Sequence, residues 1–112
     1  MVMVMERTFA ALASASRRKL LDALYRHNGQ TLLELCSNLS MSRQAASKHL
    51  AILERARLVA TVWRGREKMH FLNPVPLQAI YERWIKKFEK NRLEALALLK
   101  STLEGDKGTP DG

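Results

Sequence analysis

The sequence predicts a mainly α-helical fold with one small β-hairpin, and three patterns support this class. Apolar residues recur every three or four positions in four consecutive stretches between Met5 and Arg55, a spacing typical of amphipathic helices. Valine, threonine, tryptophan and phenylalanine then gather around Gly65, as in two strands joined by a tight turn. Helical spacing returns between Leu77 and Leu103. We therefore expect five helices and a two-stranded hairpin.

The first two helices are predicted to be short. The apolar face of the first helix consists of Met5, Phe9 and Leu12. The stretch "SASRRKLLDALYRH" predicts the second helix, with Ser16 as its N-cap residue. The apolar face of this second helix consists of Leu20, Leu21, Leu24 and Tyr25. The Asn28-Gly29 pair that follows is a turn signal, so the second helix should end there.

The third and fourth helices have clear start signals. Thr31 and Glu34 form a capping box, in which each side chain accepts a hydrogen bond from the other's backbone N–H. Ser42 is the expected N-cap residue of the fourth helix, which should end near Arg55. Its inward face is predicted to consist of Ala46, Leu50 and Leu53. The residues left on its outer face are Arg43, Gln44, Ser47 and Lys48.

The hairpin and the last helix complete the predicted domain. The strands should cover residues 58–64 and 67–72, with Gly65 near the turn. Asn73 and Pro74 suit the start of one long fifth helix, which should run from Leu77 to Leu103. The polar end of the chain predicts a flexible tail. We therefore expect one domain at residues 1–104 and a tail at 105–112.

Composition and charge narrow the function. The chain has 112 residues, 46% of them hydrophobic, which suffices for one modest core. The net charge of +8 predicts a polyanionic partner, either nucleic acid or an acidic membrane surface. Cys36 is the single cysteine, as expected in a reducing cytoplasm. The start "MVMVMERTF" resembles no signal peptide, and no apolar run is long enough to span a bilayer. These features favour a cytoplasmic protein without membrane association.

The third and fourth helices together have the pattern of a helix-turn-helix unit. Two short helices are separated by a tight break, and the outer face of the second is small and polar. In such a unit the second helix enters the major groove of DNA, with its N-terminal side chains at base edges. Arg43 is suited to guanine, Gln44 to adenine and Ser47 to either base. The residues expected at phosphates are Ser42, Lys48 and His49.

The hairpin adds basic side chains beside this helix, as the wing of a winged helix-turn-helix fold does. Arg64, Arg66 and Lys68 lie near its tip and should reach the DNA backbone or the minor groove. Between Ser42 and Lys68 the chain carries seven Arg or Lys residues but only two acidic ones. Such clustering is typical of nucleic-acid binding. A solvated turn is the competing interpretation of the arginines.

The motifs "LASASRRKLLDAL", "LLELCSNLSMSRQAASKHLAILERARLV" and "RGREKMHFLNPVPL" resemble the ArsR family of winged helix-turn-helix regulators. The resemblance covers residues 5–103. It implies a homodimeric repressor of its own or a neighbouring operon, with the first and last helices at the dimer interface. The residues that we expect there are Phe9, Leu12, Ile80, Trp84, Phe88, Leu96 and Leu99. A two-fold dimer predicts an operator that is an imperfect palindrome of double-stranded DNA.

The sequence departs from the metal-sensing members of that family. Their third helix carries a Cys-x-Cys pair, whereas this chain has Cys36 but Asn38 at the second position. One thiolate does not hold a soft metal. Residues 77–103 contain no histidine for the family's other metal site. We therefore expect a branch that senses no metal and needs no cofactor.

Three other classes of function fit the sequence less well. No catalytic triad, phosphate-binding loop or carboxylate pair stands out, so we expect no enzyme. The main alternative is a winged-helix protein–protein interaction module without specific DNA binding, in which the basic charge serves only solubility. An amphipathic helix at residues 82–100 that binds anionic membranes is a weaker alternative, because Tyr81, Trp84 and Phe88 are better used in packing.

Overall fold

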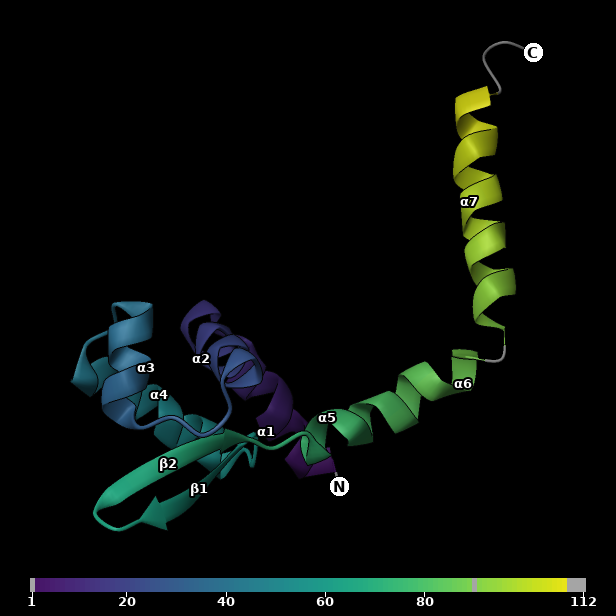
Figure 1. Ribbon diagram of the computed structural model, residues 1–112. Coiled ribbons are helices and arrows are strands. Elements are labelled where there is room, and N and C mark those ends of the chain that lie inside the picture. The colour runs from purple at the N-terminus through teal and green to yellow at the C-terminus, as the bar shows by residue number, and fades with distance from the viewer. Residues whose placement is uncertain (1, 90, 109–112) are drawn as a thin grey trace. The chain divides into compact units, whose positions relative to one another are not determined.

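The computed structural model describes residues 2–89 and 91–108, and the side chains of residues 5–86, 89 and 91–105. The chain divides into two compact units, Met1–Gln78 and Ala79–Gly112. The first unit contains helices α1 (Val2–Leu12), α2 (Ala15–Arg26), α3 (Leu32–Leu39) and α4 (Arg43–Arg55), and strands β1 (Val59–Arg64) and β2 (Glu67–Leu72) (Figure 1). This architecture confirms the predicted mainly α-helical class with one two-stranded hairpin.

Helix α2 lies at the centre of the first unit. It contacts α1, α3, α4 and strand β2. The largest fully buried apolar side chains of the core are Leu20, Leu24, Leu35, Leu53 and Leu58. Burying one leucine side chain contributes about 1.5–3 kcal/mol, so this small core holds the two helices of the helix-turn-helix unit firmly on α2.

The start of α2 differs from the prediction. The N-cap residue is Ser14, whose Oγ accepts a hydrogen bond from the Arg17 backbone N–H at 3.3 Å. Ser16 lies inside the first turn of the helix, so its prediction as the cap is wrong. A capping side chain must come from the residue just before the helix, where it reaches an N–H two or three residues into it. Since the helix begins at Ala15, only Ser14 meets this condition.

The hairpin is antiparallel, with pairs from Val59 opposite Leu72 to Arg64 opposite Glu67. Gly65 has a φ of +61°, a conformation that suits glycine at the first position of a two-residue hairpin loop. Strand β2 is also fixed to the start of α3, because the His70 N–H donates to the Gln30 carbonyl at 2.8 Å and the Gln30 N–H donates back at 3.1 Å. The wing is therefore held at its base while its tip stays exposed.

The C-terminal helix is not the single long helix that the sequence pattern predicts. Helix α5 (Val75–Ile80) continues into η1 (Tyr81–Ile85), a π-helical segment, and α6 (Lys86–Glu89), and α7 (Arg92–Gly108) begins after a turn at Asn91. The Asn91 carbonyl accepts a hydrogen bond from the Ala95 N–H at 2.7 Å, so Asn91 starts a new helix. Asparagine favours this position over a helix interior. The helices therefore exceed the five predicted.

The two ends of this helical region also refine the predicted bounds. The Asn73 Oδ1 accepts a hydrogen bond from the Val75 N–H at 3.2 Å, but α5 begins at Val75. Asn73 therefore lies one residue before the N-cap position, and Pro74, predicted as the first helical residue, occupies that position. Helix α7 extends to Gly108, into the segment predicted as a tail at 105–112. Residues 109–112 lie outside the described part of the chain, and the division at 104 stays a prediction.

Candidate nucleic-acid interface

Helix α4 presents a polar face because its apolar face is used inside the unit. Ala46, Leu50 and Leu53 are buried, as the spacing predicts. The Ser42 Oγ accepts a hydrogen bond from the Ala45 N–H at 3.1 Å, so Ser42 is the N-cap residue of α4. Arg43, Gln44, Ser47 and Lys48 are exposed along the first turns of the helix. These four side chains can therefore contact a partner without disturbing the core.

Helix α3 supports α4 from one side and is itself fixed at its start. The predicted capping box is present: the Thr31 N–H donates to Glu34 Oε1 at 2.9 Å, and the Glu34 N–H donates to Thr31 Oγ1 at 3.2 Å. The hydrogen bonds from the Thr31 backbone and side chain lower the pKa of Glu34 from its ordinary value. A left-handed residue, Ser40 (φ 51°), ends α3 and starts the short turn to α4.

His49 lies on α4 but is engaged within the fold. It is half-buried, and its Nδ1 lies 3.3 Å from a guanidinium nitrogen of Arg17 on α2. Arg17 in turn donates to the carbonyls of Ala10 and Ala11 at the end of α1. Sequence reasoning missed Arg17, because no pattern links residues 32 positions apart. His49 therefore has less freedom to reach a phosphate than Ser42 or Lys48.

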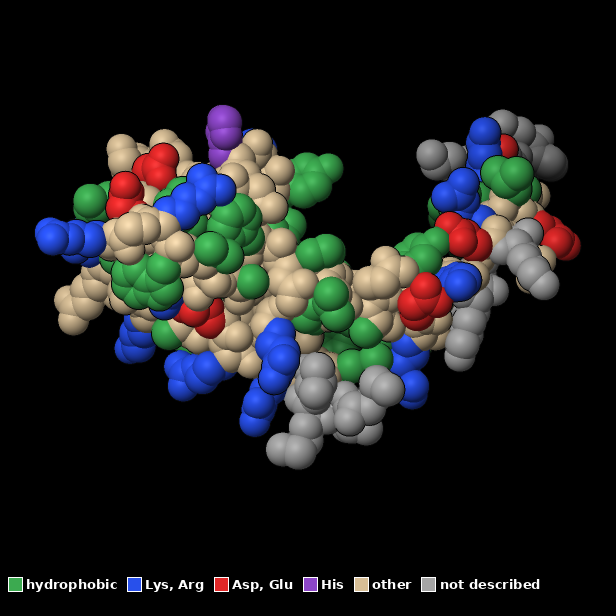
Figure 2. Space-filling view, turned by 60° about the horizontal axis from the view of Figure 1, so that its bottom comes forward, with side chains coloured by type: hydrophobic (Ala, Val, Ile, Leu, Met, Phe, Trp, Pro, Cys, Tyr) green, Lys and Arg blue, Asp and Glu red, His purple; other side chains and the backbone are tan. Residues whose placement is uncertain are grey.

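The predicted contact residues of the wing differ in their exposure and in their partners. Arg64 and Arg66 are exposed on either side of Gly65, at the tip. Lys68 is partly buried and forms an ion pair with Glu54 of α4, with its Nζ 3.4 Å from Glu54 Oε1. In Figure 2 basic side chains project from the unit that carries the hairpin. The two arginines are thus free for phosphates, whereas Lys68 must first leave Glu54.

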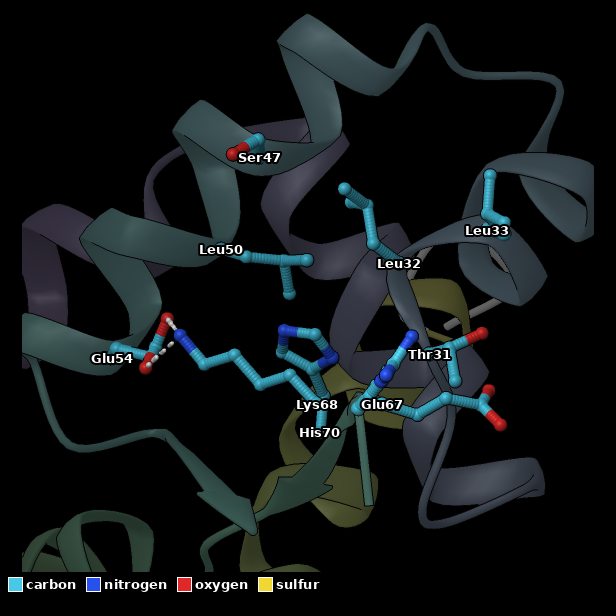
Figure 3. Close-up of a pocket in the computed structure, with 10 residues that line it drawn as sticks. Thr31, Leu32, Leu33, Ser47, Leu50, Glu54, Glu67, Lys68 and His70 are labelled. Carbon is cyan, nitrogen blue, oxygen red and sulfur yellow. Dashed lines mark hydrogen bonds and ion pairs between the residues drawn. The ribbon is translucent and has the colours of Figure 1, made fainter. Parts of the chain in front are cut away.

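A hollow lies between the helix-turn-helix unit and the wing. Its volume is about 300 Å³, and it brings together Ser47, Arg66 and Lys68 among the predicted contact residues. Figure 3 shows the ring of His70 pointing from β2 toward Leu50 and Leu32, with the Lys68–Glu54 ion pair at one side. His70 is buried, and its Nδ1 donates to the Gln30 carbonyl at 2.9 Å. His70 therefore fixes the base of the wing beside α4.

The predicted dimer residues fall in both units. In the first, Phe9 is 42% exposed, whereas Leu12 packs against the core. In the second, Ile80 is half-buried, and the exposed residues are Trp84, Leu96 and Leu99. The side chain of Phe88 lies outside the described residues. An interface through Leu12 would therefore add less new burial than one through Phe9 or the α7 leucines.

The described part of the chain contains neither a candidate metal site nor a helix that could span a membrane. No group of three or more His, Cys, Asp or Glu side chains in the described part of the chain could hold a metal ion. Cys36 is a half-buried free thiol on α3. Within the described residues no helix is both long and apolar enough to cross a membrane. The polar face of α4 and the wing stay the leading candidate site.

Comparison with known proteins points to the same part of the chain as the candidate interface. A family model described as a helix-turn-helix domain matches residues 12–62. The HTH-type transcriptional regulator YuzN of Bacillus subtilis (strain 168) is 39% identical over 83 residues, which are 69% of this chain and 90% of the relative. The ArsR-like transcriptional regulator from Rhodococcus sp. RHA1 is similar in structure, with a TM-score of 0.68, 31% identity, and coverage of 88% of this chain and 93% of that chain.

A third match shares the fold at lower identity. The homodimeric winged helix-turn-helix DNA-binding domain Mb0332 from Mycobacterium bovis has a TM-score of 0.64 and 19% identity, covering 84% of this chain and 85% of that chain. The first two matches are close enough, and long enough, to assign the family. The residues matched by the family model contain α3, α4 and the first part of β1. The chain belongs to the ArsR family of winged helix-turn-helix transcriptional regulators.

Proposed function

We propose that the protein is a homodimeric repressor that binds an imperfectly palindromic operator and controls a small operon containing its own gene. One observation carries the proposal. The inner face of α4 is buried on the core, and its N-terminal outer face consists of exposed polar and basic residues. A helix held in this way can enter the major groove as a rigid body. Its backbone is already held in place by the core before DNA binds.

The side chains on this face suit the chemistry of base edges. Arg43 can donate two hydrogen bonds to guanine, and Gln44 can pair with adenine. Ser47, beside them, is small and can donate to or accept from either base. Each good bidentate contact discriminates against a wrong base by about 1–3 kcal/mol. Arg43 and Gln44 are therefore the residues that should set the operator sequence.

Phosphate contacts are assigned to the remaining basic residues. Lys48 on α4 and Arg64 and Arg66 at the wing tip are exposed and have no ion pair among the described residues. Neutralising phosphates releases counterions from DNA, so these contacts supply affinity without sequence preference. Ser42, His49 and Lys68 are secondary members of this set, because Ser42 caps α4 and the other two have partners inside the fold.

The homodimer follows from exposed apolar surface and from a relative. The described leucines of α7 are 54–78% exposed, which is costly for a single chain in water. The Mycobacterium bovis domain with the same fold is homodimeric. A two-fold dimer places its two recognition helices about 34 Å apart, in successive major grooves. This spacing is the reason for expecting a palindrome.

The experiment is a gel shift with DNA from upstream of the gene, with competitor DNA present. Wild type is compared with Arg43→Ala/Gln44→Ala, which removes two base-reading side chains and leaves the buried face of α4 intact. We expect a specific shift with wild type and its loss in the double variant. The matched control is Arg26→Ala, which removes an exposed arginine at the end of α2.

The control separates base reading from general charge. Arg26→Ala should shift the DNA like wild type. If the control and the double variant weaken binding equally, the binding is only electrostatic and the recognition helix is misassigned. If wild type gives no specific shift with this DNA or with any fragment selected from the genome, the proposed function is wrong.

A further inference from the structure

We propose that a basic hollow between α1 and α4, away from the polar face of α4, binds a small organic acid with an apolar body. The hollow belongs entirely to the first unit. Its lining consists of Arg7, Ala10, Ala11, Arg17, Ile52, Arg55 and Ala56. Its volume is about 510 Å³, larger than the hollow beside the wing. None of its lining residues is among the predicted DNA contacts.

The charge of the hollow selects an anion. Three of the lining residues are arginines, one each from α1, α2 and α4, and none of the lining residues is acidic. Arg17 is held in place, since its Nε donates to the Ala11 carbonyl at 2.7 Å and a terminal nitrogen donates to the Ala10 carbonyl at 3.2 Å. Arg7 and Arg55 form no ion pair with the described residues. Two guanidinium groups are thus available for a carboxylate, which they bind in fork geometry.

The floor of the hollow selects an apolar body. Its lining residues Ala11 and Ala56 are only 1% and 5% exposed, and Ile52, which also lines it, packs against the core. Small apolar side chains leave room for a hydrocarbon chain or ring and offer it no hydrogen bond. A DNA phosphate has no such body. Arg55 also lies twelve residues after Arg43 on α4, about 18 Å along the helix from the base-reading end.

One contact connects the hollow to the DNA-reading helix. A terminal nitrogen of Arg17 lies 3.3 Å from Nδ1 of His49, which stands among the predicted phosphate contacts. A carboxylate in the hollow competes for this guanidinium and so releases His49. The acid would in this way change the DNA affinity of α4. This regulatory consequence rests on the proposed function, whereas the binding site itself does not.

The site is tested first without DNA. Backbone amide shifts of the full chain are followed by NMR during titration with octanoate, with its uncharged counterpart octanamide and inorganic phosphate in parallel. We expect saturable octanoate shifts centred on Ala10, Ala11 and Ile52. Arg7→Gln and Arg55→Gln each remove an exposed guanidinium with no role in the core, and each should weaken binding about tenfold or more. The control, Arg64→Gln, removes the same charge from the wing tip and should leave binding unchanged.

The other outcomes overturn the proposal. Equal binding of octanamide shows that the charge plays no part, and equal binding of phosphate shows a basic patch without an apolar subsite. Equal weakening by Arg64→Gln shows that only net charge matters. Shifts centred on another element place the ligand elsewhere.

A second titration on operator DNA tests the link to His49. Octanoate should raise the affinity of wild type for operator DNA, because it frees His49 for a phosphate, and should have no effect on Arg55→Gln. If octanoate binds but the DNA complex is unchanged, the coupling is wrong and the site stands. If the protein binds no specific DNA at all, the proposed function fails, and the result of the first titration is unaffected.

Discussion

Helices α4 and α7 have similar apolar content but opposite surroundings. In α4 the apolar residues Ala46, Leu50 and Leu53 are at most 2% exposed, because α2 and α3 cover them. In α7 the leucines at 93, 96, 98, 99 and 103 are 54–78% exposed. The chain itself therefore buries the apolar face of α4, and the exposed residues of this helix are polar except for Ala51. The leucines of α7 are exposed in the unit that contains this helix, and a second copy of the chain is their proposed cover.

The most direct test of this difference between α4 and α7 is a charged substitution in α7. Leu99→Glu should abolish the dimer, because it removes from the proposed interface one leucine of each copy, worth about 3–6 kcal/mol together, and would bury two like charges there. Sedimentation equilibrium at micromolar concentration measures the change. Leu33→Glu, at an exposed leucine of α3, should leave the dimer intact. A monomeric wild type, or a Leu99→Glu variant that still dimerises, would contradict the assignment.

The next prediction compares one leucine from each helix in a single chain. In the Leu99→Glu background, where the partner is absent, Leu53→Ala should lower the free energy of unfolding by about 2–5 kcal/mol through the cavity it leaves. Leu98→Ala should change it by less than about 0.5 kcal/mol, because Leu98 is 68% exposed. Urea unfolding followed by circular dichroism gives both values. Equal losses would mean that α7 is already packed within the monomer.

The same contrast explains how much of the fold the sequence could predict. The bounds of α3 and α4 follow from local signals, namely the Thr31–Glu34 capping box and Ser42, whose partners lie three residues away. The break before α7 was missed because apolar residues at steps of mostly three or four lie on both sides of it, although the step from Phe88 to Leu96, which spans the break, is eight residues. Asn91, followed by Glu94 three residues later, is the signal that could have shown it. A periodic pattern alone does not separate one helix from two consecutive helices.

The candidate site was predictable in its elements but not in its internal contacts. The exposure of Arg43, Gln44 and Ser47 follows from the inward positions of α4, so periodicity is sufficient. The contacts of His49 with Arg17 and of Lys68 with Glu54 depend on how α2, α4 and β2 pack. Side-chain partners across such packing leave no regular spacing in the sequence.

Substitutions at helix caps test the same comparison through smaller expected changes in the free energy of unfolding. Thr31→Ala should lower the free energy of unfolding by about 1 kcal/mol, because it removes the capping side chain of α3. Thr102→Ala in α7 removes only an exposed hydrogen bond to the Leu98 carbonyl and should cost less than about 0.5 kcal/mol. Chemical unfolding of both variants at neutral pH measures the difference. Equal costs would show that the α3 box adds nothing beyond an exposed hydrogen bond.

The same capping box should give a pH dependence. The Thr31 hydrogen bonds lower the pKa of Glu34 in the folded state, so the unfolded chain binds this proton more tightly. Its stabilisation is therefore complete above the ordinary carboxyl pKa of 4.5 and is lost as the pH falls through the lower, folded value. The stability gap between wild type and Thr31→Ala should narrow in acid. A gap that widens on acidification would contradict this sign.

The smallest predicted effects come from the ion pairs of the two units. Lys68 and Glu54 are 3.4 Å apart and 38% and 30% exposed, whereas Lys100 and Glu104 on α7 are 4.0 Å apart and 76% and 64% exposed. Double-mutant cycles should give coupling energies below about 1 kcal/mol for both, larger for the first pair because solvent screens it less.

The Lys68–Glu54 pair also has a consequence for DNA. Glu54→Gln frees the Lys68 ammonium for a phosphate and removes a negative charge from α4. It should therefore raise operator affinity about two- to fivefold. The loss of one partly exposed ion pair should lower the stability of the fold only slightly. Glu104→Gln, which removes the same charge from α7, should leave operator affinity unchanged. Gel-shift titrations at fixed salt compare the two variants. Lower affinity in Glu54→Gln would mean that the ion pair positions the wing for DNA rather than competing with it.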